Sequence, residues 1–112
     1  MKQVIPYQIG DRVLVTHSTM LVYDAQNQRV ADATVLREPT VMRVVGAVRR
    51  RLGRYNKGHS GDGYFYSEYD PDPPSLKVSG TVLLIQCRTR LFARPIEVQL
   101  EHLSQVAFEN AQ

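Results

Sequence analysis

The chain has 112 residues, which is enough for one domain (residues 1–112) with a single hydrophobic core and leaves no room for a second. Its 43% hydrophobic and 22% charged residues exclude a disordered or fibrous protein, and its one cysteine excludes an intrachain disulfide and a multi-cysteine zinc site. The net charge of +3 is too small to be diagnostic of nucleic-acid binding, although 11 of the 14 cations are Arg, which suits carboxylate and phosphate contacts.

The N-terminal residues, MKQVIPYQIGD, contain no apolar run of signal-peptide length. No stretch elsewhere approaches the ~20 apolar residues that are needed to span a bilayer. We therefore expect a soluble, cytoplasmic protein with no membrane partner.

The first part of the chain predicts short strands. GDRVLVTH, residues 10–17, opens with a turn signal and then alternates with period two, and TMLVYD, residues 19–24, predicts a second strand followed by a polar turn over AQNQ. Residues 25–38 are ambiguous between a strand and a loop with one helical turn. Pro39 predicts a boundary, because proline cannot donate to a ladder and disfavours a helical residue before it.

Residues 40–53, TVMRVVGAVRRRLG, predict a long, bent, central strand. Periodicity alone also allows a helix. Four valines and the central Gly46 weigh against it, because β-branched side chains lose rotamer freedom in a helix and glycine costs about 1 kcal/mol relative to alanine. In a strand, Gly46 would allow a bulge or a sharp bend.

The middle of the chain predicts a long loop or an irregular hairpin tip. Four glycines in residues 53–63 and the run DPDPP in residues 70–74 bracket the aromatic patch YFYSEY. Residues 75–92 predict another long extended segment with a break at Gly80. PIEVQLEHL then gives the clearest strand alternation in the chain, and EHLSQVAFEN predicts a helical turn or a last strand.

Together these elements predict a mainly β domain whose antiparallel sheet curls into a small barrel or sandwich around a long Gly/Pro-rich middle loop. The segments GDRVLV, TVMRVVGAV and IEVQLEHLSQV resemble the layout of SH3-like barrels, a group that includes Tudor-type and ribosomal-protein-type modules. The resemblance covers about half of the chain and rests on pattern. It implies that peptides or nucleic acids bind through the loops and an exposed sheet face.

Two arginine-rich segments are the candidate binding site, because eight cations share one side or end of the sheet if the segments pair. Tyrosine and phenylalanine rings lie beside the first segment in the sequence. The candidate residues are Arg49, Arg50, Arg51, Arg54, Tyr55, Lys57, Tyr64, Phe65, Tyr66, Arg88, Arg90 and Arg94. The simplest alternative is a solvated sheet edge whose charges discourage aggregation.

Two kinds of partner fit these residues. Arginines interleaved with rings are typical of single-stranded nucleic-acid binding, whereas nearby carboxylates repel phosphate. Adjacent basic and acidic stretches with tyrosines fit a protein partner or self-association, which we expect as the main function. The acidic residues in question are Asp62, Glu68, Asp70 and Asp72.

We expect no catalytic residue, metal ligand or cofactor, although an enzyme is not excluded. EYDPDPP lacks the glycine and the distal glutamate of an EF-hand loop. GHSGDG departs from the nucleophile elbow because Asp62 replaces the last glycine of that motif. The histidines lack metal-ligand spacing, and Cys87, inside VLLIQC, is expected to be a buried small hydrophobe.

Overall fold

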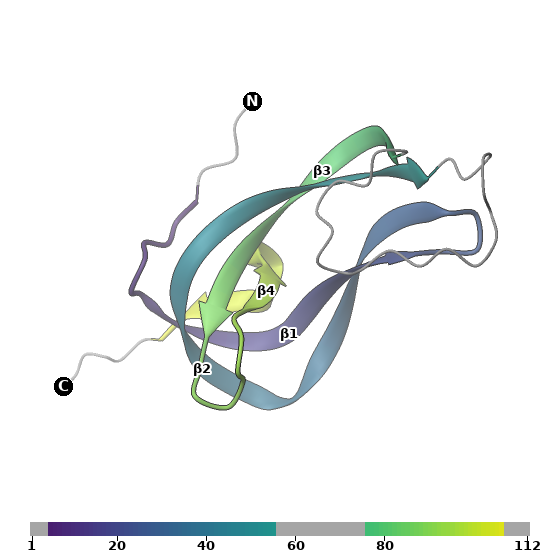
Figure 1. The fold of residues 1–112 in the computed structure, drawn as a ribbon. Coiled ribbons are helices and arrows are strands. Elements are labelled where there is room, and N and C mark those ends of the chain that lie inside the picture. Colours follow the sequence, from purple (N-terminus) through teal and green to yellow (C-terminus); the bar gives the residue numbers. More distant parts are fainter. Residues whose placement is uncertain (1–4, 56–75, 107–112) are drawn as a thin grey trace.

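The computed structural model describes residues 5–55 and 76–106, which form one antiparallel sheet of five strands (Figure 1). The elements are β1 (Arg12–Tyr23), β2 (Gln28–Tyr55), β3 (Leu76–Arg88), β4 (Ile96–Gln99), a 3-10 turn η1 (Leu100–His102) and β5 (Leu103–Gln105). The strand order is β4-β3-β2-β1-β5, so the sheet is open, with β4 and β5 at its edges. The predicted mainly β, antiparallel fold is confirmed.

Two separate strands were predicted over residues 10–17 and 19–24. The structure has one continuous strand there, β1. A tight turn at Asp24–Asn27 joins β1 to β2. The Asp24 carboxylate accepts hydrogen bonds from the amides of Gln26 and Gln28, both at 2.9 Å, and Asn27 takes a left-handed conformation with φ of 60°. Both features are typical of Asx-type turn chemistry, which is why the polar AQNQ stretch reverses the chain.

Pro39 does not mark a boundary, and that prediction is wrong, because β2 runs through it. The register explains why. Val15 pairs with Thr40 but His17 pairs with Val35, so residues 36–39 of β2 lie opposite Thr16 alone. In this irregular stretch Pro39 has no ladder hydrogen bond to donate, while Leu36 packs against the core.

The predicted bulge at Gly46 is confirmed. Val44 pairs with Cys87 and Gly46 with Gln86, which leaves Val45 without a partner on β3. The expected break at Gly80 is a change of register, because β3 continues through it. Gly53 lies on β2 at the same irregularity, because Leu52 pairs with Gly80 and Gly53 with Val78, and an added Cβ at Gly53 would lie 2.0 Å from the Lys77 carbonyl oxygen.

One face of the sheet carries the core. It consists of alternating residues from all five strands: Val13, Val15, Met42, Val44, Ile85, Cys87, Val98 and Leu103. Cys87 is fully buried, as expected for a thiol that acts as a small hydrophobe, and burial raises its pKa to about 11.

The end of the chain brings the last strand beside the first. The strand predicted over PIEVQLEHL is confirmed for residues 96–99, which form β4. The following stretch contains both a helical turn, η1, and the short strand β5, which pairs with β1. Thr19 on β1 donates a hydrogen bond of 3.3 Å to the Gln99 side chain, so the curled sheet also brings β1 against the end of β4 (Figure 1). No described segment forms a helix that is long and apolar enough to cross a membrane.

Candidate binding groove

Three arginines form a row across the sheet. Arg12 on β1 pairs directly with Arg43 on β2, and Arg43 pairs directly with Arg88 on β3. Residues that lie directly opposite each other in an antiparallel ladder point to the same face, at Cα separations of roughly 4.5–5.5 Å. All three side chains are exposed. We call these residues the arginine row.

The start of β1 is held against β2 at the arginine row. The Gly10 amide donates to the Val44 carbonyl at 2.8 Å, and the Val44 amide donates to the Asp11 carbonyl at 2.9 Å. Gly10 has a φ of +98°, a conformation that side-chain-bearing residues rarely adopt. Arg43 Nη1 donates to the Gly10 carbonyl at 3.0 Å, so the turn also orients the central arginine.

An open groove runs along the arginine row, with a volume of about 810 Å³. The row and Arg90 supply its positive charge, and Thr89 is its remaining polar residue. Its apolar lining comes from β2 and from the loop between β3 and β4: Val41, Met42, Val45, Leu91, Phe92 and Ala93. Val41, Arg43 and Val45 alternate with the buried Met42 and Val44 along β2, so all three lie on the groove side of the sheet. We call this surface the arginine groove.

The positive charge of the arginine groove is not balanced by a nearby carboxylate of the described residues. None of the side chains that line it is acidic, and no carboxylate of residues 5–55 and 76–106 forms an ion pair with its four arginines. The carboxylate of Asp11, next to Arg12 in the chain, accepts a hydrogen bond from the Gln8 amide at 2.8 Å. Directly opposed like charges are destabilising, so this arrangement has a cost in the free protein.

The groove is also apolar where a partner could make contact. The side chains of Leu91 and Phe92 are 73% and 40% exposed, and those of Val41 and Val45 are both 39% exposed. Four exposed apolar side chains beside four arginines provide both a hydrophobic contact area and anion-binding groups.

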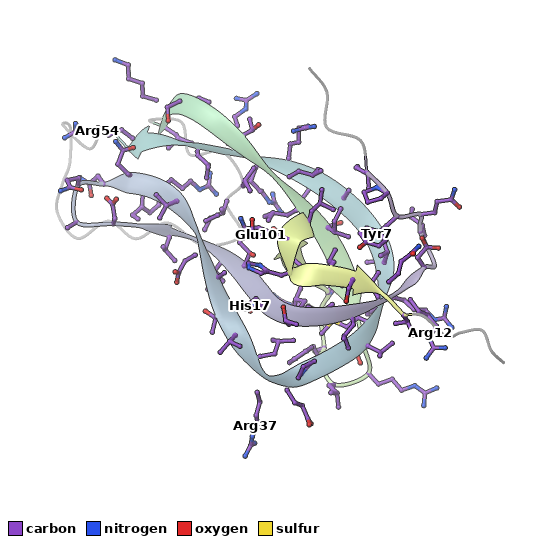
Figure 2. The ribbon with its side chains drawn as sticks, turned by 180° about the vertical axis from the view of Figure 1, so that it is seen from behind. Tyr7, Arg12, His17, Arg37, Arg54 and Glu101 are labelled. Carbon is purple, nitrogen blue, oxygen red and sulfur yellow. The ribbon has the colours of Figure 1, made fainter. Side chains whose placement is uncertain are left out.

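The other predicted arginines lie farther along the β2–β3 ladder. Arg49 pairs with Leu83, five residues along β3 from Arg88, which corresponds to about 17 Å of strand. Arg54 pairs with Lys77 near the end of the ladder. Arg12 and Arg54 accordingly lie at opposite ends of the molecule in Figure 2.

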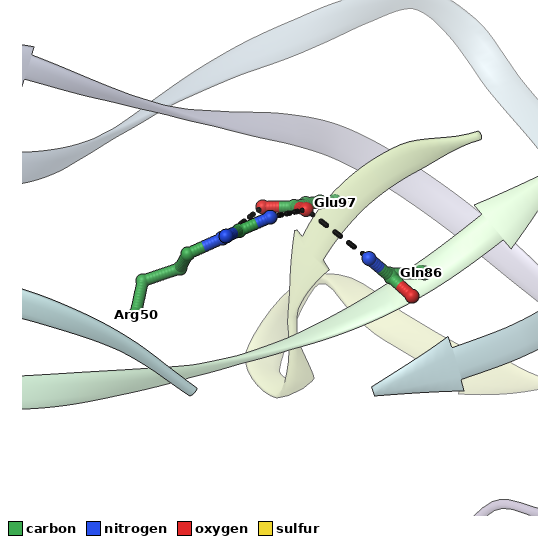
Figure 3. Close-up of polar contacts among 3 residues, drawn as sticks. All are labelled: Arg50, Gln86 and Glu97. Atoms are coloured by element: carbon green, nitrogen blue, oxygen red, sulfur yellow. Dashed lines mark hydrogen bonds and ion pairs between the residues drawn. The ribbon is translucent and has the colours of Figure 1, made fainter. Parts of the chain in front are cut away.

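Arg50 has a different role from the groove arginines. Its Nη2 lies 2.6 Å from Glu97 Oε2 and its Nε donates to Oε1 at 3.2 Å, while Gln86 Nε2 donates to the same carboxylate at 3.3 Å (Figure 3). Both charged side chains are 23% exposed. This two-point pair links β2 to β4 across β3, so Arg50 stabilises the sheet.

The two predicted arginine segments are therefore neighbours, but their charged groups do not gather at one place. Arg88 and Arg90 line the groove, whereas Arg94 belongs to the same loop and is not among the lining residues. The side chain of Tyr55 lies outside the described residues, as do Lys57, Tyr64, Phe65 and Tyr66. The acidic residues at 62, 68, 70 and 72 lie outside them too.

Sequence reasoning missed Arg12 and Arg43, which are isolated cations in two separate strands. Each of the two arginines lies one position before a core valine. They face each other only when β1 and β2 are aligned, so only the strand register could have indicated them. Leu91 and Phe92 were missed as well. Two large apolar residues in a loop flanked by arginines are the corresponding signal.

A histidine pair forms a further cluster outside the arginine groove. His17 and His102 stack with ring centroids 4.1 Å apart, and the hydroxyl of Thr16 lies 2.8 Å from His17 Nδ1. Among the described residues there is no group of three or more side chains that could hold a metal ion. No family model, curated protein or solved structure matches the chain.

Proposed function

We propose that this domain is a non-enzymatic binding module that holds an acidic segment of a protein partner in the arginine groove. The observation that carries the proposal is the arginine row, three directly opposed cations that form no ion pair with a described carboxylate, in a groove with no acidic residue in its lining. A partner's carboxylates would remove the repulsion within the row and form charge-assisted hydrogen bonds with its guanidinium groups.

The lining favours a peptide over a nucleic acid. Six of the eleven lining residues are apolar, and Phe92 supplies the one ring in the lining. Single-strand binders use several rings on which successive bases stack, whereas aliphatic pockets accept apolar side chains. We therefore expect a segment in which acidic and apolar residues lie close together.

A second copy of the chain meets the same requirement. Asp62, Glu68, Asp70 and Asp72 are interspersed with tyrosines in its sequence. Self-association through this segment would give a particle mass above 12.7 kDa by light scattering, and added salt would lower that mass because exposed ion pairs are screened. A strict monomer at high concentration and low salt would restrict the partner to other proteins.

We also infer that the open sheet is a variant of the SH3-like barrel. Three features support this: the first and last strands are neighbours, the second strand is long and bent, and a 3-10 turn separates the last two strands. Peptide binding beside a loop on the outer surface is in keeping with what that resemblance implies.

Fluorescence anisotropy with a labelled peptide of alternating Glu and Leu tests the proposal. The double variant Arg43→Glu/Arg88→Glu should weaken binding by about tenfold or more, because it replaces attraction by repulsion at the centre of the groove. The matched control Arg49→Glu/Arg54→Glu makes the same charge change farther along the same ladder and should bind like wild type.

The outcomes separate the candidates. Equal loss in both double variants, or no binding by the wild type at low salt, would overturn the proposal. Single-stranded oligonucleotides serve as the second probe. Tighter binding of an oligonucleotide than of the peptide, with a steep salt dependence, would replace the peptide with nucleic acid as the partner.

A further inference from the structure

We infer that the arginine groove recognises a phosphorylated peptide, with the arginine row receiving a single dianionic phosphate monoester. This inference rests on the proposed function, since it names the chemical group that the same groove would bind. It is drawn from the spacing of the three arginines, from the amount of charge that they bring together and from the apolar residues beside them.

The spacing allows three guanidinium groups to meet at one anion. Neighbouring strands lie roughly 4.7–4.9 Å apart, so the outer members of the row, Arg12 and Arg88, are separated by about 10 Å with Arg43 between them. The three side chains leave the same face of the sheet. Since an arginine side chain is long enough to lean over its neighbour, all three can converge above Arg43.

The charge in the row exceeds what one carboxylate can use. A carboxylate carries one negative charge, which a single guanidinium neutralises in a two-point contact with its two oxygens. A phosphate monoester carries nearly two charges at neutral pH and three terminal oxygens. Three arginines that can converge, with Arg90 in the lining of the same groove, match this group better than they match an isolated Asp or Glu.

The apolar lining indicates that the phosphate is carried by a peptide. Val41 and Val45 are exposed on β2 on either side of Arg43 in the sequence, and Leu91 and Phe92 are exposed in the facing loop. These side chains would contact apolar residues that flank the phosphorylated one. Free inorganic phosphate would use the arginine row alone and should therefore bind much more weakly.

Three labelled peptides of otherwise identical sequence test the inference, with a central phosphoserine, glutamate or serine between leucines. We expect the phosphoserine peptide to bind about tenfold more tightly than the glutamate peptide, and the serine peptide to bind most weakly. The preference should disappear in Arg43→Gln/Arg88→Gln and persist in the matched control Arg49→Gln/Arg54→Gln. Cooperative thermal unfolding of both variants, at melting temperatures no lower than that of wild type, establishes that they are folded.

Acid gives a second, independent readout. A phosphate monoester gains a proton near pH 6, so the affinity for the phosphoserine peptide should fall between about pH 7.5 and 5.5. Glutamate carboxylates stay ionised in that range, and no histidine lines the groove, so the affinity for the glutamate peptide should stay constant.

The outcomes distinguish failure of the phosphate inference from failure of the proposed function. If the phosphoserine and glutamate peptides bind equally well and depend equally on the groove arginines, the phosphate inference is wrong and the proposed function stands. If none of the peptides binds, both are wrong. A phosphoserine preference that survives in Arg43→Gln/Arg88→Gln would also overturn the inference, because another site would then bind the phosphate.

Discussion

At the scale of single residues, the most informative side chains are those that lower stability. Arg12, Arg43 and Arg88 face one another directly, and a row of like charges is unfavourable in a free sheet. Sites that conflict with folding are often those kept for binding. The same three residues should therefore show opposite effects of mutation on stability and on affinity.

Replacing Arg88 by Thr should raise the free energy of unfolding by on the order of 0.5 kcal/mol at low salt, because it removes one like-charge pair. Chemical denaturation at low and high salt measures this. The gain should shrink as salt screens the remaining charges. The matched control is Arg49→Thr, since Arg49 is an exposed β2 arginine opposite Leu83, with no opposed cation. Equal effects at both positions would contradict the electrostatic explanation.

Cys87 should make folding sensitive to alkaline pH. Burial raises its thiol pKa from 9.0 to about 11, so the folded state keeps a proton that the unfolded state loses. This contribution to the free energy of unfolding is complete below pH 9 and is lost as the pH rises toward 11. The total loss is on the order of 2 kcal/mol. Unfolding curves across this range should therefore fall more steeply for wild type than for Cys87→Ala. Parallel curves would show that the thiol does not titrate in this way.

Only two of the four groove arginines could be selected from the sequence. Arg88 and Arg90 could be selected because they lie in a visibly cationic stretch. Arg12 and Arg43 could not, because 30 residues separate them in the sequence and only the ladder register brings them together. That register depends on the bulge at residues 36–39, where β2 contains extra residues that no local pattern reveals.

At the scale of elements, β2 determines the shape of the sheet. It pairs with β1 along its first part and with β3 along its second, and irregularities at residues 36–39, Val45 and Gly53 lie between or within these ladders. The extended nature of residues 40–53 and the bulge at Gly46 followed from valine and glycine content. The path through Pro39 did not, because local proline chemistry cannot show that its missing donor falls within an unpaired stretch of β2.

Gly53 should be the least replaceable glycine of the described strands. A Cβ there would lie 2.0 Å from the Lys77 carbonyl oxygen and 2.9 Å from the Val78 Cα, both backbone atoms that cannot move aside. Gly53→Ala should therefore lower the free energy of unfolding by roughly 1–3 kcal/mol or more, as measured by thermal or chemical denaturation.

Gly80 provides the control for that prediction. It lies on β3 opposite Leu52, next to the same irregularity, and a Cβ there would meet nothing within 4 Å. Gly80→Ala should stay within about 0.5 kcal/mol of wild type. A comparable loss in both variants would indicate that general loss of strand flexibility, and not the close approach to Lys77, is responsible.

At the scale of the whole molecule, the main structural finding is how the arginines of the described residues are distributed over the sheet. The arginine-rich segments do pair, as the binding hypothesis required, but one cluster lies beside the β3–β4 loop and the other toward the far end of the ladder. Composition and spacing predicted a basic surface on a β domain. They could not divide the cations between a structural pair, Arg50 with Glu97, and groove arginines that form no ion pair with a described carboxylate, because that division depends on long-range packing.

The position of the binding surface is best tested by titrating the isotope-labelled protein with the Glu/Leu peptide and following backbone amide shifts by NMR. The arginine groove predicts that the largest shifts cluster at Arg12, Arg43 and residues 88–92. Shifts confined to residues 49–54, or shifts absent from all three strands of the arginine row, would contradict it.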